Sequence, residues 1–183
     1  MAGGSILGNR VLRKEDPKFL TSGGEYVDDM RNEPLLTGAA WVTYVRSSVA
    51  HGRITSIDTS DAASMPGILG VFTAESLGLQ PVPAAFNPMV SRTLLASDKV
   101  RYVGEPVVAI VSETREEGAD AADAVYIDID PLEAFVDVES AMASTTLLYD
   151  TAGSNVVFDT TVLGIPDNTG DAYFAGCEVV VKG

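Results

Sequence analysis

The stretch that most constrains the fold runs from residue 100 to residue 130. The apolar run 107–111 follows a turn and has the composition of a fully buried strand. Residues 114–117 (Thr-Arg-Glu-Glu) match a capping box, which predicts that a helix begins there. A second β-rich run, 125–130, ends at Pro131. The dozen residues between the two runs are about the minimum for a parallel βαβ crossover, so we predict a βαβ unit with residues 107–111 as its buried central strand.

Shorter elements are predicted on both sides of this unit. β-Branched and aromatic residues favour a strand over 35–45, and residues 50–59 alternate imperfectly, which indicates a strand with a bulge. Three prolines without a clear period predict an extended loop over 78–91. The other predicted elements are helical turns at 16–20 and 62–65, a strand at 68–72, a helix at 139–143, and strands at 156–163 and 178–181.

Composition and charge exclude several classes of function. Of the 183 residues, 46% are hydrophobic and 21% charged, which is typical of a globular domain with a core. A net charge of −14 argues against nucleic acid or an anionic membrane as a partner. No apolar run approaches the ~20 residues that span a bilayer, and the first nine residues lack a signal-peptide pattern. The single cysteine excludes an internal disulfide, which is compatible with a reducing, intracellular setting. Together with the lack of a spanning or signal segment, it leads us to expect a soluble cytoplasmic protein with no membrane insertion.

The residue types of a hydrolytic triad gather around His51, the only histidine. Ser47, Ser48 and Asp58 lie nearby in the sequence. No Gly-x-Ser-x-Gly turn is present to expose a nucleophile, however. A structural role for His51 is the preferred interpretation, and a hydrolase that uses Ser48 and His51 is a remote alternative.

Two further sets of charged residues have a structural and a functional interpretation. Arg46, His51 and Arg53 are a positive cluster that could dock an acidic partner or balance local charge, and we favour the second. Asp128 and Asp130 share one face of a predicted strand and could coordinate a hard cation. A solvated acidic face fits the strongly negative net charge better.

The remaining candidates are also assigned to structure. The adjacent carboxylates at 28–29 point to opposite faces of an extended chain. The glycines at 23–24 and Gly104 are too sparse to cradle a phosphate, and Gly104 indicates a turn. Cys177 lies among apolar neighbours, which predicts a core position. The sequence therefore offers no catalytic, cofactor-binding or metal-binding residue.

Four stretches, in this order, resemble a known family. They are RKEDPKFLT (13–21) followed by YVDD (26–29), VRSSVAHGRI (45–54), PGILGVFT (66–73) and KVRYVGEPV (99–107). They resemble the start of the large, molybdenum-cofactor-binding subunit of the xanthine dehydrogenase, aldehyde oxidase and carbon monoxide dehydrogenase family, and the first stretch is closest to the carbon monoxide dehydrogenase branch. The resemblance covers residues 13 to about 140. It departs at Ser22, where glycine is common, and at Gly52, where alanine is usual.

This resemblance implies a fold, a domain plan and a set of partners. The implied fold is the α/β-hammerhead, of class α/β (α+β), with a mixed sheet containing the βαβ unit. It implies an N-terminal arm at 1–18, the hammerhead at 19–143, and at 144–183 a linker and the truncated start of the molybdenum-cofactor-binding domain.

In the family, the catalytic glutamate and the pterin contacts lie downstream of this segment, so none is carried over. The resemblance implies a molybdenum–pterin cofactor in the full-length subunit, and iron–sulfur clusters and FAD in partner subunits. We expect this chain to frame the molybdopterin-binding domains and to be inactive alone. A stand-alone hammerhead module that binds a partner or aids assembly is the alternative.

Overall fold

The computed structural model describes residues 13–21, 23–24, 30, 34–159 and 174–181. The chain divides into two units, Met1–Ala39 and Ala40–Gly183. The first unit contains helix α1 (Asp16–Thr21), which the Asp-Pro start predicts, and the 3-10 turn η2 (Pro34–Leu36). None of the helices within the described ranges is long and apolar enough to cross a membrane.

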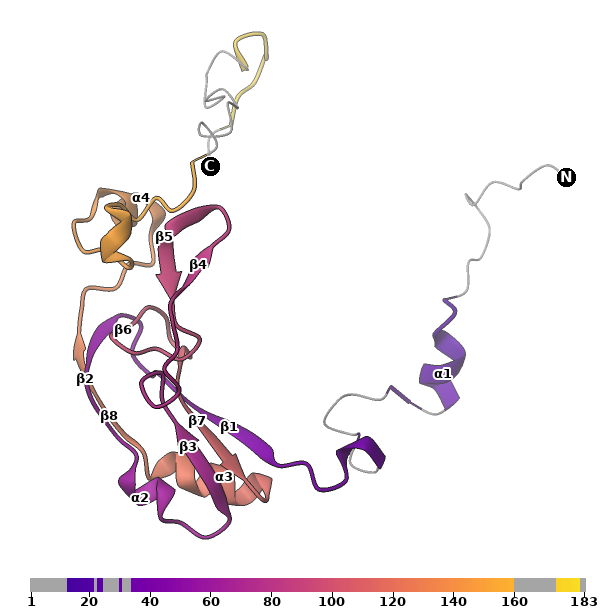
Figure 1. The fold of residues 1–183 in the computed structure, drawn as a ribbon. Coiled ribbons are helices and arrows are strands. Elements are labelled where there is room, and N and C mark those ends of the chain that lie inside the picture. Colours follow the sequence, from indigo (N-terminus) through magenta and orange to yellow (C-terminus); the bar gives the residue numbers. More distant parts are fainter. Residues whose placement is uncertain (1–12, 22, 25–29, 31–33, 160–173, 182–183) are drawn as a thin grey trace, which may run out of the picture. The chain divides into compact units, whose positions relative to one another are not determined.

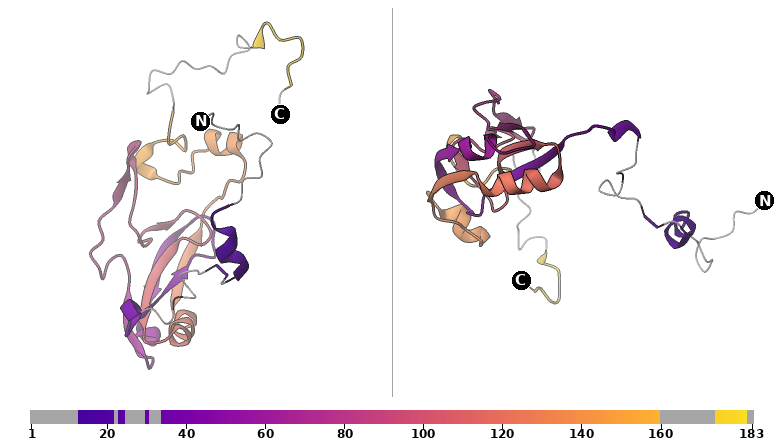
Figure 2. Two further views of the ribbon diagram at one scale, coloured as in Figure 1. Left: turned by 90° about the vertical axis from the view of Figure 1, so that its right-hand side faces the viewer. Right: turned by 90° about the horizontal axis from the view of Figure 1, so that it is seen from below.

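The second unit is built on a three-stranded sheet whose central strand is β7 (Pro106–Ser112). Strands β1 (Trp41–Arg46) and β3 (Ile68–Phe72) pair with β7 on either side, both antiparallel. Helix α3 (Arg115–Asp123) contacts all three strands, and the short helix α2 (Ser60–Ala63) contacts β3 and α3 (Figures 1 and 2). The prediction of a buried central strand is thus confirmed.

A second sheet has the order β6–β2–β8 and is also antiparallel. Its strands are β6 (Lys99–Val100), β2 (Gly52–Asp58) and β8 (Tyr126–Pro131). The parallel βαβ crossover is therefore wrong, because β7 and β8 belong to different sheets and all strand pairs among the described residues are antiparallel. Since β1 and β3 occupy both edges of β7, β8 has no free edge to join there and pairs with β2 instead.

Several predicted boundaries need correction. The strand expected from residue 35 begins at Trp41, because η2 occupies the preceding positions. The loop expected at 78–91 contains the hairpin of β4 (Val82–Ala84) and β5 (Asn87–Arg92), where a two-stranded edge tolerates proline. Residues 156–159 and 178–181 are not in strands, and residues 160–163 lie outside the described part.

Other local predictions are confirmed. The bulge in β2 falls between Ile54 and Ser56. Helix α4 (Val138–Ala143) begins after Asp137, whose carboxylate accepts from the Ser140 N–H at 2.8 Å. The 3-10 turn η3 (Asp150–Ala152) follows it. Gly104 turns the chain into β7 with φ of +90°, a conformation that disfavours any residue with a Cβ.

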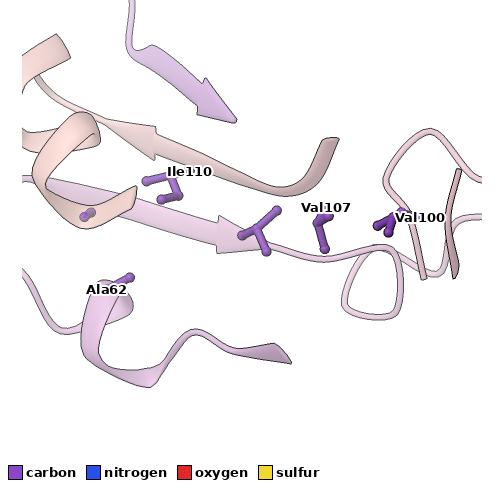
Figure 3. Packing of buried hydrophobic residues seen from close by; sticks show 7 residues of the cluster. Ala62, Val100, Val107 and Ile110 are labelled. Atoms are coloured by element: carbon purple, nitrogen blue, oxygen red, sulfur yellow. The ribbon is translucent and has the colours of Figure 1, made fainter. Parts of the chain in front are cut away.

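The hydrophobic core lies where β7 meets α3, α2 and β6. Its fully buried members are Ala62, Ala96, Val100, Val107, Val108, Ile110 and Ala121, some of which are labelled in Figure 3. The residues of β7 supply most of its volume. The second unit therefore contains a hydrophobic core of its own.

Helix α3 begins and packs through specific side chains. The Glu117 N–H donates to Thr114 Oγ1 at 3.3 Å and the Thr114 N–H donates to Glu117 Oε2 at 3.0 Å, which is the predicted capping box. A Cβ on Gly118 would stand 2.6 Å from both Ser112 Oγ and Thr43 Oγ1. This glycine therefore lets the helix approach β7 and β1 closely.

Candidate functional site

The structure buries the side chain of His51. Its Nδ1 lies 2.8 Å from the backbone oxygen of Glu133, and this contact requires the proton on Nδ1. Ser47 Oγ donates to the Val49 oxygen at 2.7 Å, and Ser48 is exposed. No hydrogen bond joins a serine hydroxyl to the His51 ring among the described contacts, so the geometry of a hydrolytic pair is missing.

The predicted positive cluster does not form a single surface. Arg46 donates to the Gly104 oxygen at 2.9 Å and its guanidinium lies 5.4 Å from the ring centre of Tyr44, whereas His51 is buried. Arg53 lies 3.9 Å from Asp150 in an exposed contact. The interpretation as local charge balance fits these separate contacts.

The acidic residues of β8 lie on its exposed face. Asp128 and Asp130 are both exposed, and Asp128 Oδ2 accepts from Ser56 Oγ at 2.9 Å. No group of three His, Cys, Asp or Glu within the described ranges could hold a metal ion. Residues 28–29 lie outside the described part, and Cys177 is exposed, so its predicted core position is wrong. The donor atoms of the described residues do not form a site that fits a metal cofactor.

The most unusual polar feature is a buried ion network at Lys99. The Lys99 side chain is 1% exposed, and its Nζ donates to both carboxylate oxygens of Asp150 at 2.9 and 3.0 Å. The third contact is with the Leu147 backbone oxygen at 3.0 Å. All three donors of the ammonium group are therefore used, which is the condition for burying a charge at low cost.

Arg101 and Glu105 extend this network. Arg101 Nη1 donates to the Lys99 oxygen at 2.8 Å and Nε donates to the Leu148 oxygen at 3.2 Å. The carboxylate of Glu105 is fully buried, and its Oε2 accepts from the Arg101 backbone N–H. Its Oε1 has no hydrogen bond but lies 3.7 Å from Arg92 Nη1 and 4.0 Å from Arg101 Nη1. Two guanidinium groups thus compensate one buried negative charge.

The contacts of Lys99 and Arg101 hold residues 144–159, which we call the strap, against β6 and the turn that follows it. Asn155 links the strap to itself and to helix α4, because its Nδ2 donates to the oxygens of Thr146 and Ala141 at 2.9 and 3.0 Å. Asn155 Oδ1 accepts from the Leu148 N–H at 3.0 Å. One amide side chain therefore fixes the loop that Lys99 and Arg101 bind.

The hairpin β4–β5 binds the strap from another side. The Asn87 side chain donates to the Val157 oxygen at 3.0 Å, and Thr151 Oγ1 donates to the Met89 oxygen at 2.7 Å. Figure 1 shows the hairpin beside the orange segment that comes after α4. The strap is thus held by the charged side chains of Lys99 and Arg101 and by uncharged hydrogen bonds to the hairpin.

The Lys99 contact lowers the pKa of Asp150 below its usual range. The side-chain hydrogen bond from Lys99 is the main cause, and the charges of Lys99, Arg53 and Arg101 act in the same direction. Partial burial opposes them. Because the carboxylate is 57% exposed, solvent screens much of this interaction.

One pocket of about 210 Å³ lies beside the bulge of β2. It is lined by residues 54–57, 73–75 and 96–97. Its threonine and serine at 55–56 already bond to Asp128, through Oγ1 of Thr55 at 3.2 Å and Oγ of Ser56 at 2.9 Å. The pocket offers one exposed carboxylate, Glu75, and shows no constellation for chemistry.

Sequence reasoning missed the ion network. Lys, Arg and Glu are rarely fully buried, so the charged residues of KVRYVGEPV would ordinarily be assigned to the surface. The family resemblance singled out this stretch but not its role. For Asp150 and Asn155, which lie in a polar loop, we find no signal in the sequence.

The fold and its relatives together define a class of protein. A family model described as "Aldehyde oxidase and xanthine dehydrogenase, a/b hammerhead domain" matches residues 21–133. The nicotine 6-hydroxylase large subunit of Paenarthrobacter nicotinovorans is 39% identical over 139 residues, which cover 73% of this chain and 16% of that protein. The carbon monoxide dehydrogenase large chain of Afipia carboxidovorans is 37% identical, with 74% and 16% coverage.

Solved structures agree with this assignment. Quinoline 2-oxidoreductase from Pseudomonas putida 86 matches with a TM-score of 0.69 and 30% identity, over 94% of this chain and 22% of that one. The chain belongs to the aldehyde oxidase and xanthine dehydrogenase hammerhead family, so the predicted fold class is confirmed. It spans about a sixth of the length of the large subunits that it matches.

Proposed function

We propose that this chain is the N-terminal structural domain of the large subunit of a molybdenum hydroxylase, and that it frames the molybdopterin-binding domains without being catalytic itself. Family membership and the share of the relatives that the chain covers support this proposal. Its most specific structural support is the anchored strap. Lys99 and Arg101 fix the segment that leads away from the hammerhead, which suits a domain that orients the next domain of a longer polypeptide.

The proposal includes a domain plan and partners. We infer an arm at 1–18, the hammerhead at 19–143, and at 144–183 a linker that leads into the molybdenum-cofactor-binding domain. The molybdenum–pterin cofactor would be held by that downstream part, and iron–sulfur and FAD subunits would complete a cytoplasmic hetero-oligomer. The names of relatives as large subunits or large chains, and as subunit gamma of a dehydrogenase complex, support such an assembly.

The size of the native polypeptide tests this function. The tryptic peptide 102–115, which contains β7, should be recovered from the source cells in a polypeptide several times larger than 19.2 kDa, and molybdenum should co-purify with it. Recovery of a native 19.2-kDa protein without molybdenum would support a stand-alone partner-binding or assembly module instead.

A further inference from the structure

The strap and the hairpin β4–β5 together present a small apolar surface. The rings of Phe86 and Phe158 lie 5.8 Å apart with an interplanar angle of 78°, an edge-to-face contact. Met89 lies further along the hairpin and Val156 on the strap. All four side chains are exposed or nearly half exposed: Phe86 57%, Met89 51%, Phe158 46% and Val156 40%. We call these four residues the hairpin–strap surface.

This surface is centred on a pair of aromatic rings. Two aromatic rings already in contact leave their outer faces open to solvent, and aromatic residues and methionine are enriched in protein interfaces. None of the four side chains is charged, although the chain as a whole carries −14. An apolar partner would therefore bury them without desolvating a charge.

The surface is also fixed in place before any partner binds. The strap is held by the three contacts of Lys99 Nζ and by the Asn87 and Thr151 hydrogen bonds to and from the hairpin. A surface that is ordered in advance loses less conformational entropy on binding. The ion network at Lys99 thus helps to fix this surface in place.

We propose that the hairpin–strap surface docks an apolar face of the downstream part of the same large-subunit polypeptide. This inference rests on the proposed function. It identifies the surface through which the N-terminal domain contacts the rest of the large subunit. Connectivity selects the occupant, because Phe158 is part of the surface and the chain continues from it. A downstream domain would be tethered beside the surface at a high effective concentration. The relatives offer ample length for it, since the matched part is 16% of each.

Oxidation of methionine by dilute peroxide tests the docking directly, because Met89 lies in the surface and Met142 lies on α4 at 60% exposure. In the 183-residue chain both should oxidise at similar rates. In the complete large subunit the ratio of Met89 to Met142 oxidation should fall by about tenfold or more, equivalent to ~1.4 kcal/mol. An unchanged ratio would overturn the proposal. Protection of Met89 that rises with the concentration of the isolated chain would also overturn it, in favour of a second copy.

A pair of variants in the complete large subunit separates docking from stability. Phe86→Ser should restore Met89 oxidation towards its rate in the isolated chain. Leu69→Ser, an exposed leucine on β3 outside the surface, should leave Met89 protected. Equal effects of the two variants would contradict the assignment. If a large subunit exists and Met89 is still reactive in it, docking fails while the proposed function stands; if only a 19.2-kDa protein exists, the function itself fails.

Discussion

Strand β7 and the strap are held by opposite kinds of interaction. β7 is buried between β1 and β3 under α3, and its contacts with the rest of the unit are mainly apolar. The strap has no buried residue between 144 and 159 and depends on Lys99, Arg101 and the amide of Asn155. Apolar burial makes the core cooperative, whereas a segment held by hydrogen bonds and ion pairs can open locally. The second unit thus combines a hydrophobic core with a strap that is anchored separately by polar contacts.

The largest effect should result from truncation in β7. Ile110→Ala removes a fully buried side chain and should lower the free energy of unfolding by about 2–5 kcal/mol, because the sheet and α3 cannot fully collapse into the space. Val42→Ala, on β1 at 53% exposure, should change it by less than about 0.5 kcal/mol. Urea denaturation measures both, and similar losses would refute the assignment of β7 as the core.

Next comes the contact of α3 with the sheet. In Gly118→Ala the new methyl group would meet Ser112 Oγ and Thr43 Oγ1 at 2.6 Å, and this clash alone should lower the free energy of unfolding by about 1–3 kcal/mol. The gain in helix propensity, about 1 kcal/mol, offsets part of this loss. Asp120→Ala, at an exposed position of the same helix, gains propensity without a clash and should not destabilise. A stabilised Gly118→Ala protein would show that α3 packs less closely.

The anchor of the strap should have a smaller and local effect. Lys99→Met keeps the apolar stem but removes three donors, so the strap should open more readily by about 1–2 kcal/mol. The exchange of the Leu148 amide proton, which is bonded to Asn155 Oδ1, reports this opening. Arg53→Met removes only the exposed 3.9 Å contact with Asp150 and should leave that exchange unchanged. Equal effects of Lys99→Met and Arg53→Met on this exchange would contradict the assignment of Lys99 as the anchor of the strap.

Acidification should release the strap before the core, and this effect is expected to be the smallest. The pKa of Asp150 is lower in the folded chain, so its stabilising contribution is present above the unfolded pKa of about 3.9 and is lost as pH falls through the lowered value. Protection of the Leu148 amide, corrected for intrinsic exchange, should decline in that range. In Asp150→Asn the protection should be weaker at neutral pH and its decline shallower. The pH dependence of protection that remains in Asp150→Asn would come from Asp137, whose pKa is lowered by the hydrogen bond from the Ser140 N–H.

The contrast between the two regions also explains what the sequence could predict. The apolar run of β7 and the Thr114–Glu117 capping box are local patterns, and both elements formed as expected. Pairing is not local. The antiparallel arrangement was missed because nothing within residues 100–130 reveals that β1 and β3 occupy both edges of β7.

Local sequence patterns could not predict the contacts that hold the strap, for the same reason. Lys99 and Asp150 are 51 residues apart, and each has the sequence context of a surface residue. The packing role of Gly118 was likewise missed. Close approach to Thr43 depends on tertiary packing, which spacing along the helix does not show.

The proposed role makes this chain the frame of a molybdenum hydroxylase, with no chemistry of its own. The most direct test measures molybdenum content and substrate oxidation of the purified 183-residue chain beside those of the complete large subunit assembled with its partners. We expect a folded 183-residue chain with neither stoichiometric molybdenum nor turnover, and both in the assembled protein. One molybdenum per 183-residue chain, or turnover by that chain alone, would contradict this role.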